Sequence, residues 1–281
     1  MTIVVTGATG NVGRPLVREL AAAGAPVRAV TRTPETADFP DGVEAVSSAV
    51  DALRGASAVF LNSRALGSDP GDLDKFVTLA RQCGVSKLVA LSAINADDDF
   101  SRQPSRFRGD RNKEVEQVAI DSGLTWVSLR PSVFASNFIG MWAGQLRAGD
   151  VVGGPYAAAS TAPIVDADIA AVAAHAFLTD ELDSQQVPLT GPQAFTNAEL
   201  VEIIGRVLNR PLRYIEAPPD VVRQRFIDIG LGAEFADAYM ALLADTLDTP
   251  TLVTREVEKI TGRPATTFAQ WVADHRDLFT K

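Results

Sequence analysis

Cysteine and histidine are scarce in this chain of 281 residues, which contains one Cys and two His. Because Cys83 stands alone, no internal disulfide can form, and a lone thiol is typical of a reducing compartment such as the cytoplasm. His175 and His275 lie far apart in the sequence and match no zinc or haem spacing. We therefore expect neither a disulfide nor a metal centre.

Positive charge and long apolar runs are also in short supply. The chain has 26 Lys and Arg against 35 Asp and Glu, a formal net charge of -9. A field of that sign repels a phosphate backbone, so nucleic acid is not an expected partner. No apolar run approaches the roughly 20 residues that cross a bilayer, and the N-terminus lacks the pattern of a secretion signal. These features predict a cytoplasmic protein without a membrane span.

Short β-branched runs alternate with helix-period segments through the first half of the chain. The expected strands lie at residues 2–6, 26–32, 43–47, 57–63, 87–93 and 124–131. Strands that are apolar on both faces and separated by helices are typical of a parallel sheet covered on both sides. The crossover between the third and fourth strands has room for only a turn or two of helix. We expect an α/β fold, with a doubly wound parallel sheet of the Rossmann type over residues 1–150.

The pattern changes beyond about residue 150. The Gly/Pro/Ala-rich stretch "GDVVGGPYAAASTAP" precedes an expected helix at 166–178 and an isolated strand at 186–191. Thr196 and Glu199 then have the spacing of a capping box at the start of a helix. A further short strand and three helical segments finish the chain. We expect residues 151–281 to form a smaller, mainly helical, substrate-binding lobe that lends a strand near 186–190 to the sheet.

The stretch "VVTGATGNVG", residues 4–13, lies between the first expected strand and the first expected helix. In this context glycines permit a tight turn, let the backbone approach a pyrophosphate, and let the helix pack closely on the strand. The alternative is a tight turn that holds no ligand. The residues expected to bind a dinucleotide here are Gly7, Thr9, Gly10, Asn11, Val12 and Gly13.

Arg32 follows the second strand, where a dinucleotide site reads the adenosine ribose. NAD-binding sites place a carboxylate there, whereas a 2′-phosphate requires a cation without a nearby anion. This chain has Thr31 and Arg32 at the strand end. The sequence therefore favours NADPH (NADP+) as the cofactor, the alternative being that Arg32 is merely a solvated cation.

Several stretches resemble one known family. They are "TGATGNVG", the strand-ending "VTR", "KEVEQVAIDSGLTWVSLRPSVFASNF" and "TGRPATTFAQWVADH". They resemble the NmrA-like, atypical branch of the short-chain dehydrogenases/reductases, and more narrowly its bacterial NAD(P)H-binding proteins. The resemblance covers nearly the whole chain. It implies the fold and the nucleotide but no single reaction, because the family includes quinone and ketone reductases as well as redox sensors without turnover.

Tyrosine is scarce as well, and the pattern Tyr-x-x-x-Lys does not occur in the sequence. Typical short-chain dehydrogenases use that tyrosine to protonate a carbonyl oxygen, while the lysine anchors the nicotinamide ribose. By resemblance, Lys113 stands at the lysine position, but Gly109 occupies the position four residues earlier. General acid catalysis is worth roughly two to four orders of magnitude in rate. Without it, either the cofactor is bound and not used, or the substrate forms an oxyanion that needs less help.

Candidate catalytic residues are Ser92 and Lys113. Ser92 follows the fifth strand, at the sheet edge where doubly wound folds bind ligands, although the family serine normally comes one residue later, at Ala93. The alternatives are a strand-end cap for Ser92 and a solvated lysine for Lys113. At the same edge, we expect further cofactor contacts from Asn62, Ser63, Arg64, Lys113 and Pro131. The basic segment 102–113 is expected to be a solvated loop, with a gate over the cofactor as the alternative.

Substrate contacts are expected from the loops above that edge. The segment "RPSVFASNF" resembles the part of the family that closes over the nicotinamide, and "GGPYAAAS" is a flexible-looking stretch with a tyrosine. Aromatic side chains at such spacing also occur in protein cores. The candidate substrate-binding residues are Phe134, Asn137, Phe138, Trp142 and Tyr156.

These observations favour an NADPH-dependent reductase of a quinone or an aromatic, polyketide-like ketone, acting by hydride transfer. The alternative is a non-catalytic NADP(H) sensor that binds a protein partner. An isomerase or dehydratase that retains the cofactor is a third hypothesis, but no dedicated acid/base pair is seen for it. A homodimer remains open.

Overall fold

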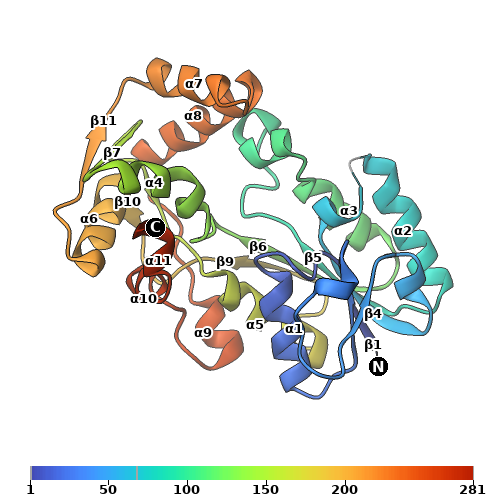
Figure 1. The fold of residues 1–281 in the computed structure, drawn as a ribbon. Helices are drawn as coiled ribbons and strands as arrows, with labels where there is room; N and C mark the ends of the chain where they lie inside the picture. Colours follow the sequence, from blue (N-terminus) through green and yellow to red (C-terminus); the bar gives the residue numbers. More distant parts are fainter. Residues whose placement is uncertain (1, 68, 281) are drawn as a thin grey trace.

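The computed structural model describes residues 2–67 and 69–280, and a seven-stranded sheet lies at its centre (Figure 1). Its strands are β1 (Thr2–Val5), β2 (Val27–Val30), β3 (Glu44–Val46), β4 (Ala56–Leu61), β5 (Lys87–Leu91), β6 (Thr125–Pro131) and β9 (Gln185–Leu189). Their order is β3-β2-β1-β4-β5-β6-β9, and every neighbouring pair is parallel. The predicted doubly wound parallel sheet is confirmed.

Apolar side chains on both faces of the strands explain why helices cover both sides of this sheet. In β1, Ile3 and Val5 pack on one side with helices α1 (Gly13–Ala22) and α5 (Asp166–Leu178), whereas Val4 packs on the other. That second side is covered by α2 (Pro70–Gln82) and α3 (Asn112–Asp121). The short third crossover is the 3₁₀ turn η2 (Asp51–Leu53), as its length predicts.

A second group of elements packs around its own apolar core, to the left in Figure 1. Its helices are α4 (Asn137–Ala148), α6 (Asn197–Leu208), α10 (Phe268–Asp274) and α11 (Arg276–Thr280). Two small pairings complete it: β7 (Val151–Gly154) with β11 (Arg213–Glu216), and β8 (Ser160–Thr161) with β10 (Phe195–Thr196). The predicted capping box at α6 is present, because Glu199 N donates to Thr196 Oγ1 at 3.1 Å and Thr196 N donates to Glu199 Oε2 at 2.7 Å.

More helices follow β11 than the sequence predicts. Within the described residues they are α7 (Pro219–Asp228), α8 (Ala233–Asp248), α9 (Glu256–Thr261), α10 and α11. Gly230 and Gly232 separate α7 from α8, and Gly262 ends α9 with a positive φ of 72°. These breaks were missed because a helical period continues through them.

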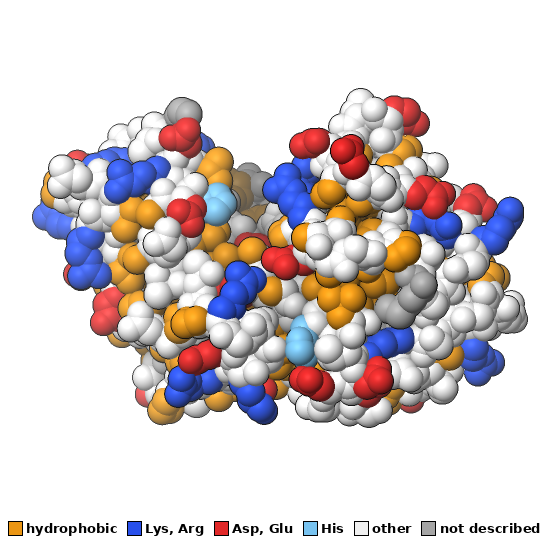
Figure 2. Space-filling model, turned by 90° about the horizontal axis from the view of Figure 1, so that it is seen from below, with side chains coloured by type: hydrophobic (Ala, Val, Ile, Leu, Met, Phe, Trp, Pro, Cys, Tyr) orange, Lys and Arg blue, Asp and Glu red, His pale blue; other side chains and the backbone are white. Residues whose placement is uncertain are grey.

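The described residues contain no helix long and apolar enough to cross a membrane, and no cluster of His, Cys, Asp and Glu suited to a metal ion. Seen from below, the molecule is notched between its two halves (Figure 2). Acidic, basic and hydrophobic side chains are mixed over this face rather than gathered by charge.

Candidate active site

The loop between β1 and α1 is built so tightly that only glycine fits at its critical positions. Gly7 has φ +66°, and Gly10 N donates to Gly7 O at 2.9 Å. A Cβ on Gly13 would overlap Gly7 O and lie 2.9 Å from Ala8 Cα. The loop therefore brings the start of α1 close against the strand, the arrangement that a phosphate site at a helix N-terminus requires.

The glycine loop exposes the residues that could contact a ligand and buries the one that anchors it to the core. Thr9, Gly10 and Asn11 are exposed, whereas Val12 is 3% exposed and packs in the core. A hollow of about 430 Å³ lies against the loop, lined by Thr9, Gly10, Asn11, Arg14, Pro15, Arg18, Glu19 and Ala167. A second hollow of about 530 Å³ lies far from the loop, where α6 ends at residues 202–212, and has no connection to the sheet edge.

The segment after β4 lies directly beside the glycine loop. Buried Thr6 donates its hydroxyl to Phe60 O at 2.7 Å and accepts from Asn62 N at 3.0 Å. Asn62 in turn accepts from Arg64 N at 3.2 Å and so begins the 3₁₀ turn η3 (Ser63–Ala65). The structure thus places this candidate segment next to Gly7, at the switch point between β1 and β4 where doubly wound sheets bind ligands.

Ser63 and Arg64 are tied to the start of α3. Ser63 Oγ accepts from Arg111 N at 3.1 Å, and Arg64 Nε pairs with Asp110 Oδ1 at 3.0 Å. Burial raises the pKa of Asp110, and Arg64 opposes that effect. The basic segment is therefore held by ion pairs, another being Arg106 Nη1 with Glu114 Oε1 at 2.6 Å, rather than loose in solvent.

Two residues that the sequence reasoning did not single out connect the loop to the second half of the chain. Asn11 Nδ2 donates to Ser136 Oγ at 3.0 Å, and Ser136 Oγ donates to Asp166 Oδ1 at 2.9 Å. Asp166 is 7% exposed, and burial raises its pKa. Ser136 immediately precedes α4 and Asp166 is the first residue of α5, so this chain of bonds fixes both helix starts against the glycine loop. In the sequence, Ser136 stands beside Asn137 and Asp166 stands near Asp168. No pattern therefore distinguished Ser136 or Asp166 from these polar neighbours.

Arg32 follows the carboxyl end of β2 and is exposed. Its guanidinium makes no hydrogen bond or ion pair with any other described residue. A cation left unpaired at this position suits a 2′-phosphate.

Lys113, on the first turn of α3, is ion-paired with Asp97. Arg130 Nη1 also reaches Asp97, with its nitrogen 2.7 Å from Oδ2. The hydrogen bonds from Lys113 and then Arg130 lower the pKa of Asp97. Lys113 is thus held at the sheet edge by Asp97. To bind a ribose hydroxyl, its ammonium group must either keep Asp97 as a second partner or release it.

The anchor of this network is Glu116, which is 1% exposed. Arg130 Nη2 lies 2.5 Å from Glu116 Oε1, Ser128 Oγ donates to Glu116 Oε2 at 2.5 Å, and Gln186 Nε2 donates to Oε1 at 3.0 Å. Burial acts to raise the pKa of Glu116, but the bonds from Arg130 and Ser128 outweigh it and the pKa is lowered. Glu116 is therefore an anion that positions Arg130, and through it Asp97 and Lys113.

Ser92 lies at the predicted edge but is 3% exposed, and its hydroxyl donates to Asn112 O at 2.9 Å. Its hydrogen is therefore engaged by the first residue of α3. Pro131 is buried at the end of β6, where its carbonyl accepts from Ile94 N at 2.9 Å. Catalysis by Ser92 stays a prediction, and the bond to Asn112 must break for it to act.

The candidate substrate residues separate into two groups. Phe138 and Trp142 are 2% and 6% exposed, with ring centroids 4.7 Å apart, and they pack in the core of the second half. Phe134 and Tyr156 are half-buried and Asn137 is exposed. The second group remains accessible to a ligand, whereas the packing of Phe138 and Trp142 favours a structural contribution.

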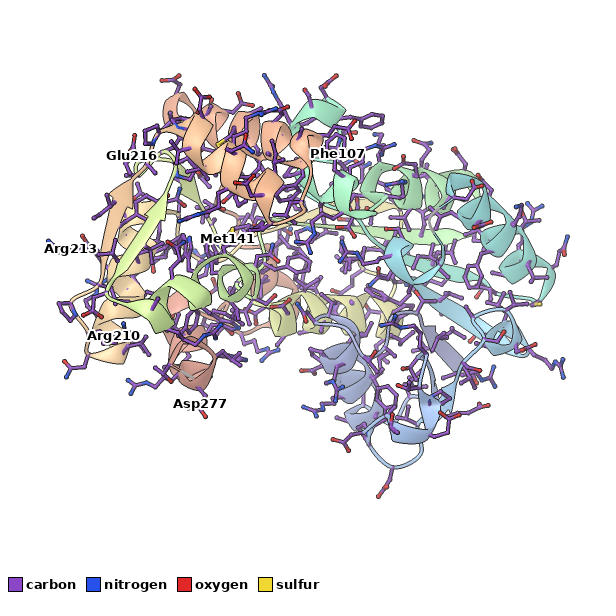
Figure 3. All side chains as sticks on the ribbon, turned by 45° about the horizontal axis from the view of Figure 1, so that its top comes forward. Phe107, Met141, Arg210, Arg213, Glu216 and Asp277 are labelled. Atoms are coloured by element: carbon purple, nitrogen blue, oxygen red, sulfur yellow. The ribbon has the colours of Figure 1, made fainter. Side chains whose placement is uncertain are left out.

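Helix α8 packs against the segment that follows β5 at the carboxyl edge of the sheet. It packs against the 3₁₀ helices η4 (Phe100–Arg102) and η5 (Pro104–Arg108), which follow β5, and Arg102 Nε pairs with Asp245 Oδ2 at 3.0 Å. Figure 3 shows Phe107 of η5 close to this helix, with Met141 of α4 nearer the middle of the molecule. The sequence predicts helical segments in this part of the chain but not the packing of α8 at the sheet edge, because nothing in its pattern signals which face meets that edge.

Comparison with known proteins decides what this arrangement is. The profile of the NAD(P)H-binding family matches residues 7–180. The chain belongs to this family. The resemblance identified from the sequence motifs is thereby confirmed, as is a nicotinamide dinucleotide as the cofactor.

Two relatives that share 30% or more of the sequence over nearly the whole chain are named as reductases. The chain is 35% identical over 288 residues to a (4-alkanoyl-5-oxo-2,5-dihydrofuran-3-yl)methyl phosphate reductase of Streptomyces griseus, covering 99% of both chains. It is 30% identical over 294 residues to an NAD(P)H azoreductase of Xenophilus azovorans, again covering 99% of both. The fold matches an NADPH-dependent quinone oxidoreductase from Escherichia coli complexed with NADPH, with a TM-score of 0.81 at 20% identity over 98% of this chain and 100% of that one. The chain is an NAD(P)H-dependent oxidoreductase.

The residues of the site fit the cofactor that the family name implies. Thr9, Gly10 and Asn11 of the loop are exposed, and the segment 62–64 lies beside Gly7. Arg32, after β2, makes no ion pair with any described residue. When bound, the reduced nicotinamide supplies two electrons and a hydrogen as hydride.

Arg32→Ala is expected to weaken NADPH binding roughly 10- to 100-fold, since a charge-assisted contact to phosphate is worth about 1.5–3 kcal/mol. NADH, which lacks the 2′-phosphate, should bind as it does to the wild type. Calorimetric titration with both coenzymes measures the difference. Arg54→Ala is the matched control, because Arg54 is also exposed but precedes β4 at the amino edge of the sheet. An equal loss for NADPH and NADH would remove Arg32 from the phosphate site.

Proposed function

We propose that this protein is an NADPH-dependent reductase of a quinone or an aromatic ketone. The family and the reductases that share 30% or more of its sequence support the reaction class. Their acceptors, as their names give them, are a conjugated furanone phosphate and, for the azoreductase, an azo compound. An acceptor with an extended conjugated system is common to that group, and we extend it to this chain.

The observation that carries the proposal is the backbone at Gly109. This residue stands four before Lys113, ends η5 and has φ +97°. Tyrosine there would be strained whatever space is available, so the chain cannot align a phenol with Lys113 in the usual way. A ketone without conjugation develops a localised oxyanion and depends on a phenol whose pKa a neighbouring lysine lowers, whereas a quinone or conjugated acceptor spreads the charge and needs only a hydrogen-bond donor.

Anaerobic oxidation of NADPH, followed by the absorbance of the reduced ring, tests the proposal. The panel comprises quinones, aromatic ketones, azo compounds and an unconjugated aliphatic ketone as the negative control. We expect turnover with one or more conjugated acceptors and none with the aliphatic ketone. Absence of turnover with every conjugated acceptor, by a protein that binds NADPH, would instead favour the sensor hypothesis.

A further inference from the structure

The chain's three tyrosine hydroxyls are in different environments. Tyr214 donates to Pro155 O at 2.7 Å, where β7 and β11 pair, and this bond fixes a turn. Tyr156 lies on a turn with φ +47° and is half-buried. Tyr239 lies on α8 and donates to Met141 Sδ at 3.3 Å. A thioether is a weak acceptor, so little free energy is lost if this hydroxyl turns to a better partner.

The position of Tyr239 connects it to the cofactor loop. Ser136, which accepts from Asn11 of the glycine loop, immediately precedes α4, and Met141 follows five residues later. At 1.5 Å per residue these two positions are about 7.5 Å apart along the helix axis. The Tyr239 hydroxyl contacts the side chain of Met141 across from this helix. The first turns of α4 thus connect the glycine loop, through Ser136, with the phenol of α8, through Met141.

Two aromatic rings hold the phenol in place. The ring of Phe235 is stacked on that of Tyr239, with centroids 6.0 Å apart and planes at 13°. The ring of Phe226 meets it edge-on at 5.2 Å and 89°. The two rings hold the phenol ring in place, and the nearby methionine sulfur is a poor hydrogen-bond acceptor. The Tyr239 hydroxyl is therefore a positioned donor that can turn to a better acceptor.

The protonation state of Tyr239 is compatible with a hydroxyl that donates a hydrogen bond. Burial raises the pKa of Tyr239 to about 12. The neutral phenol therefore persists through the physiological range and keeps its hydrogen for donation.

We propose that Tyr239 is the hydrogen-bond donor to the acceptor oxygen of the substrate, taking the place of the phenol that Gly109 excludes. The inference rests on the proposed function and adds a named residue and a requirement on the substrate. The substrate must be flat enough to enter beside the rings of Phe226 and Phe235 and must carry an oxygen at its edge. As negative charge develops on that oxygen, the donated bond strengthens and lowers the barrier.

Tyr239→Phe removes only the hydroxyl, and Tyr214→Phe is the matched control with the same chemical change at a structural site. With 1,4-naphthoquinone and an aromatic ketone as probes, kcat of Tyr239→Phe should fall on the order of 100-fold. The decrease in kcat should be larger with the ketone than with the quinone, because the oxyanion formed from the ketone is more localised. The Kd for NADPH should be unchanged, and Tyr214→Phe should keep wild-type kcat. Thermal melting should place Tyr239→Phe within a few degrees of the wild type, because a bond to sulfur is weak.

A second readout does not depend on turnover. The Kd of 1,4-naphthoquinone for the protein saturated with NADP+ should rise roughly 2- to 10-fold in Tyr239→Phe, as expected for one lost hydrogen bond. Wild-type kcat and naphthoquinone affinity in Tyr239→Phe would overturn the inference and leave the proposed function standing. If Tyr156→Phe, and not Tyr239→Phe, lost kcat and naphthoquinone affinity, the donor would be Tyr156 and the inference about Tyr239 would also be overturned. A wild-type protein that neither reduces nor binds either probe would reject the proposed function and this inference together.

Discussion

Gly13→Ala is expected to abolish measurable NADPH binding and to lower the melting temperature by roughly 5–10 °C. The added Cβ overlaps Gly7 O and lies 2.9 Å from Ala8 Cα, both of which are backbone atoms with no rotamer to change. Either α1 moves away from β1 or the loop opens, and overpacking of this kind costs about 1–3 kcal/mol. Because the first amides of α1 then lose their positions, the loss of affinity should exceed what the loss of stability alone explains.

Two other glycine variants make this result specific. A Cβ on Gly10 would lie 3.2 Å from Gly7 O, so Gly10→Ala should fold with a small change in melting temperature and still lose NADPH affinity, because the methyl stands at the loop surface. A Cβ on Gly144 meets nothing within 4 Å, and Gly144→Ala at this exposed position of α4 should be stabilising by about 0.5–1 kcal/mol with NADPH affinity unchanged. Calorimetry and thermal melting of the three variants measure both effects. NADPH bound normally by Gly13→Ala would show that the loop is not the phosphate site.

Glu116→Ala is expected to destabilise the protein by about 3–5 kcal/mol, measured by chemical denaturation. The substitution leaves Arg130, whose side chain is 14% exposed, without its main partner and removes an acceptor from Ser128 and Gln186. The double variant Glu116→Leu with Arg130→Met should recover much of the loss, since apolar replacement of a buried pair is often neutral. Lys113 should lose its orientation in the double variant, because Asp97 is then held by one cation fewer.

The pH dependence of wild-type stability checks the same network. The folded-state pKa values of Glu116 and Asp97 are both lowered, so their contribution is fully present above the pKa of the unfolded chain, which is about 4. It is lost as the pH falls through the folded-state values. Glu116→Gln should therefore show a shallower loss of stability below about pH 4 than the wild type. Parallel curves for the two proteins would contradict the assignment of an ionised Glu116.

The sequence predicts the parts of this site that depend on local pattern. Gly7, Gly10 and Gly13 are fixed by the turn that joins a strand to a helix, and the sheet follows from strands apolar on both faces. Arg32 could be named because it stands at a known point after the second strand. Each of these inferences needs only neighbours in the chain.

Contacts between distant segments could not be predicted in the same way. The bond from Asn11 to Ser136 joins residues 125 apart, and Tyr239 meets Met141 across 98 residues. Phe138 and Trp142 have the aromatic character expected of a pocket. In the fold, however, α10 packs against them, with the ring centroids of Phe268 and Phe138 5.4 Å apart, and the region is a core. Which face of α4 or α8 meets the cofactor edge is a property of the assembled fold.

Isothermal titration of the wild-type protein with NADPH and with NADH tests the central claim most directly. That claim is that the amides opening α1 hold the pyrophosphate while Arg32 holds the 2′-phosphate. We expect saturable binding of NADPH with one site per chain, and NADH affinity lower by roughly 10- to 100-fold. Titration without saturation by either coenzyme would contradict the account, and so would equal affinity for both.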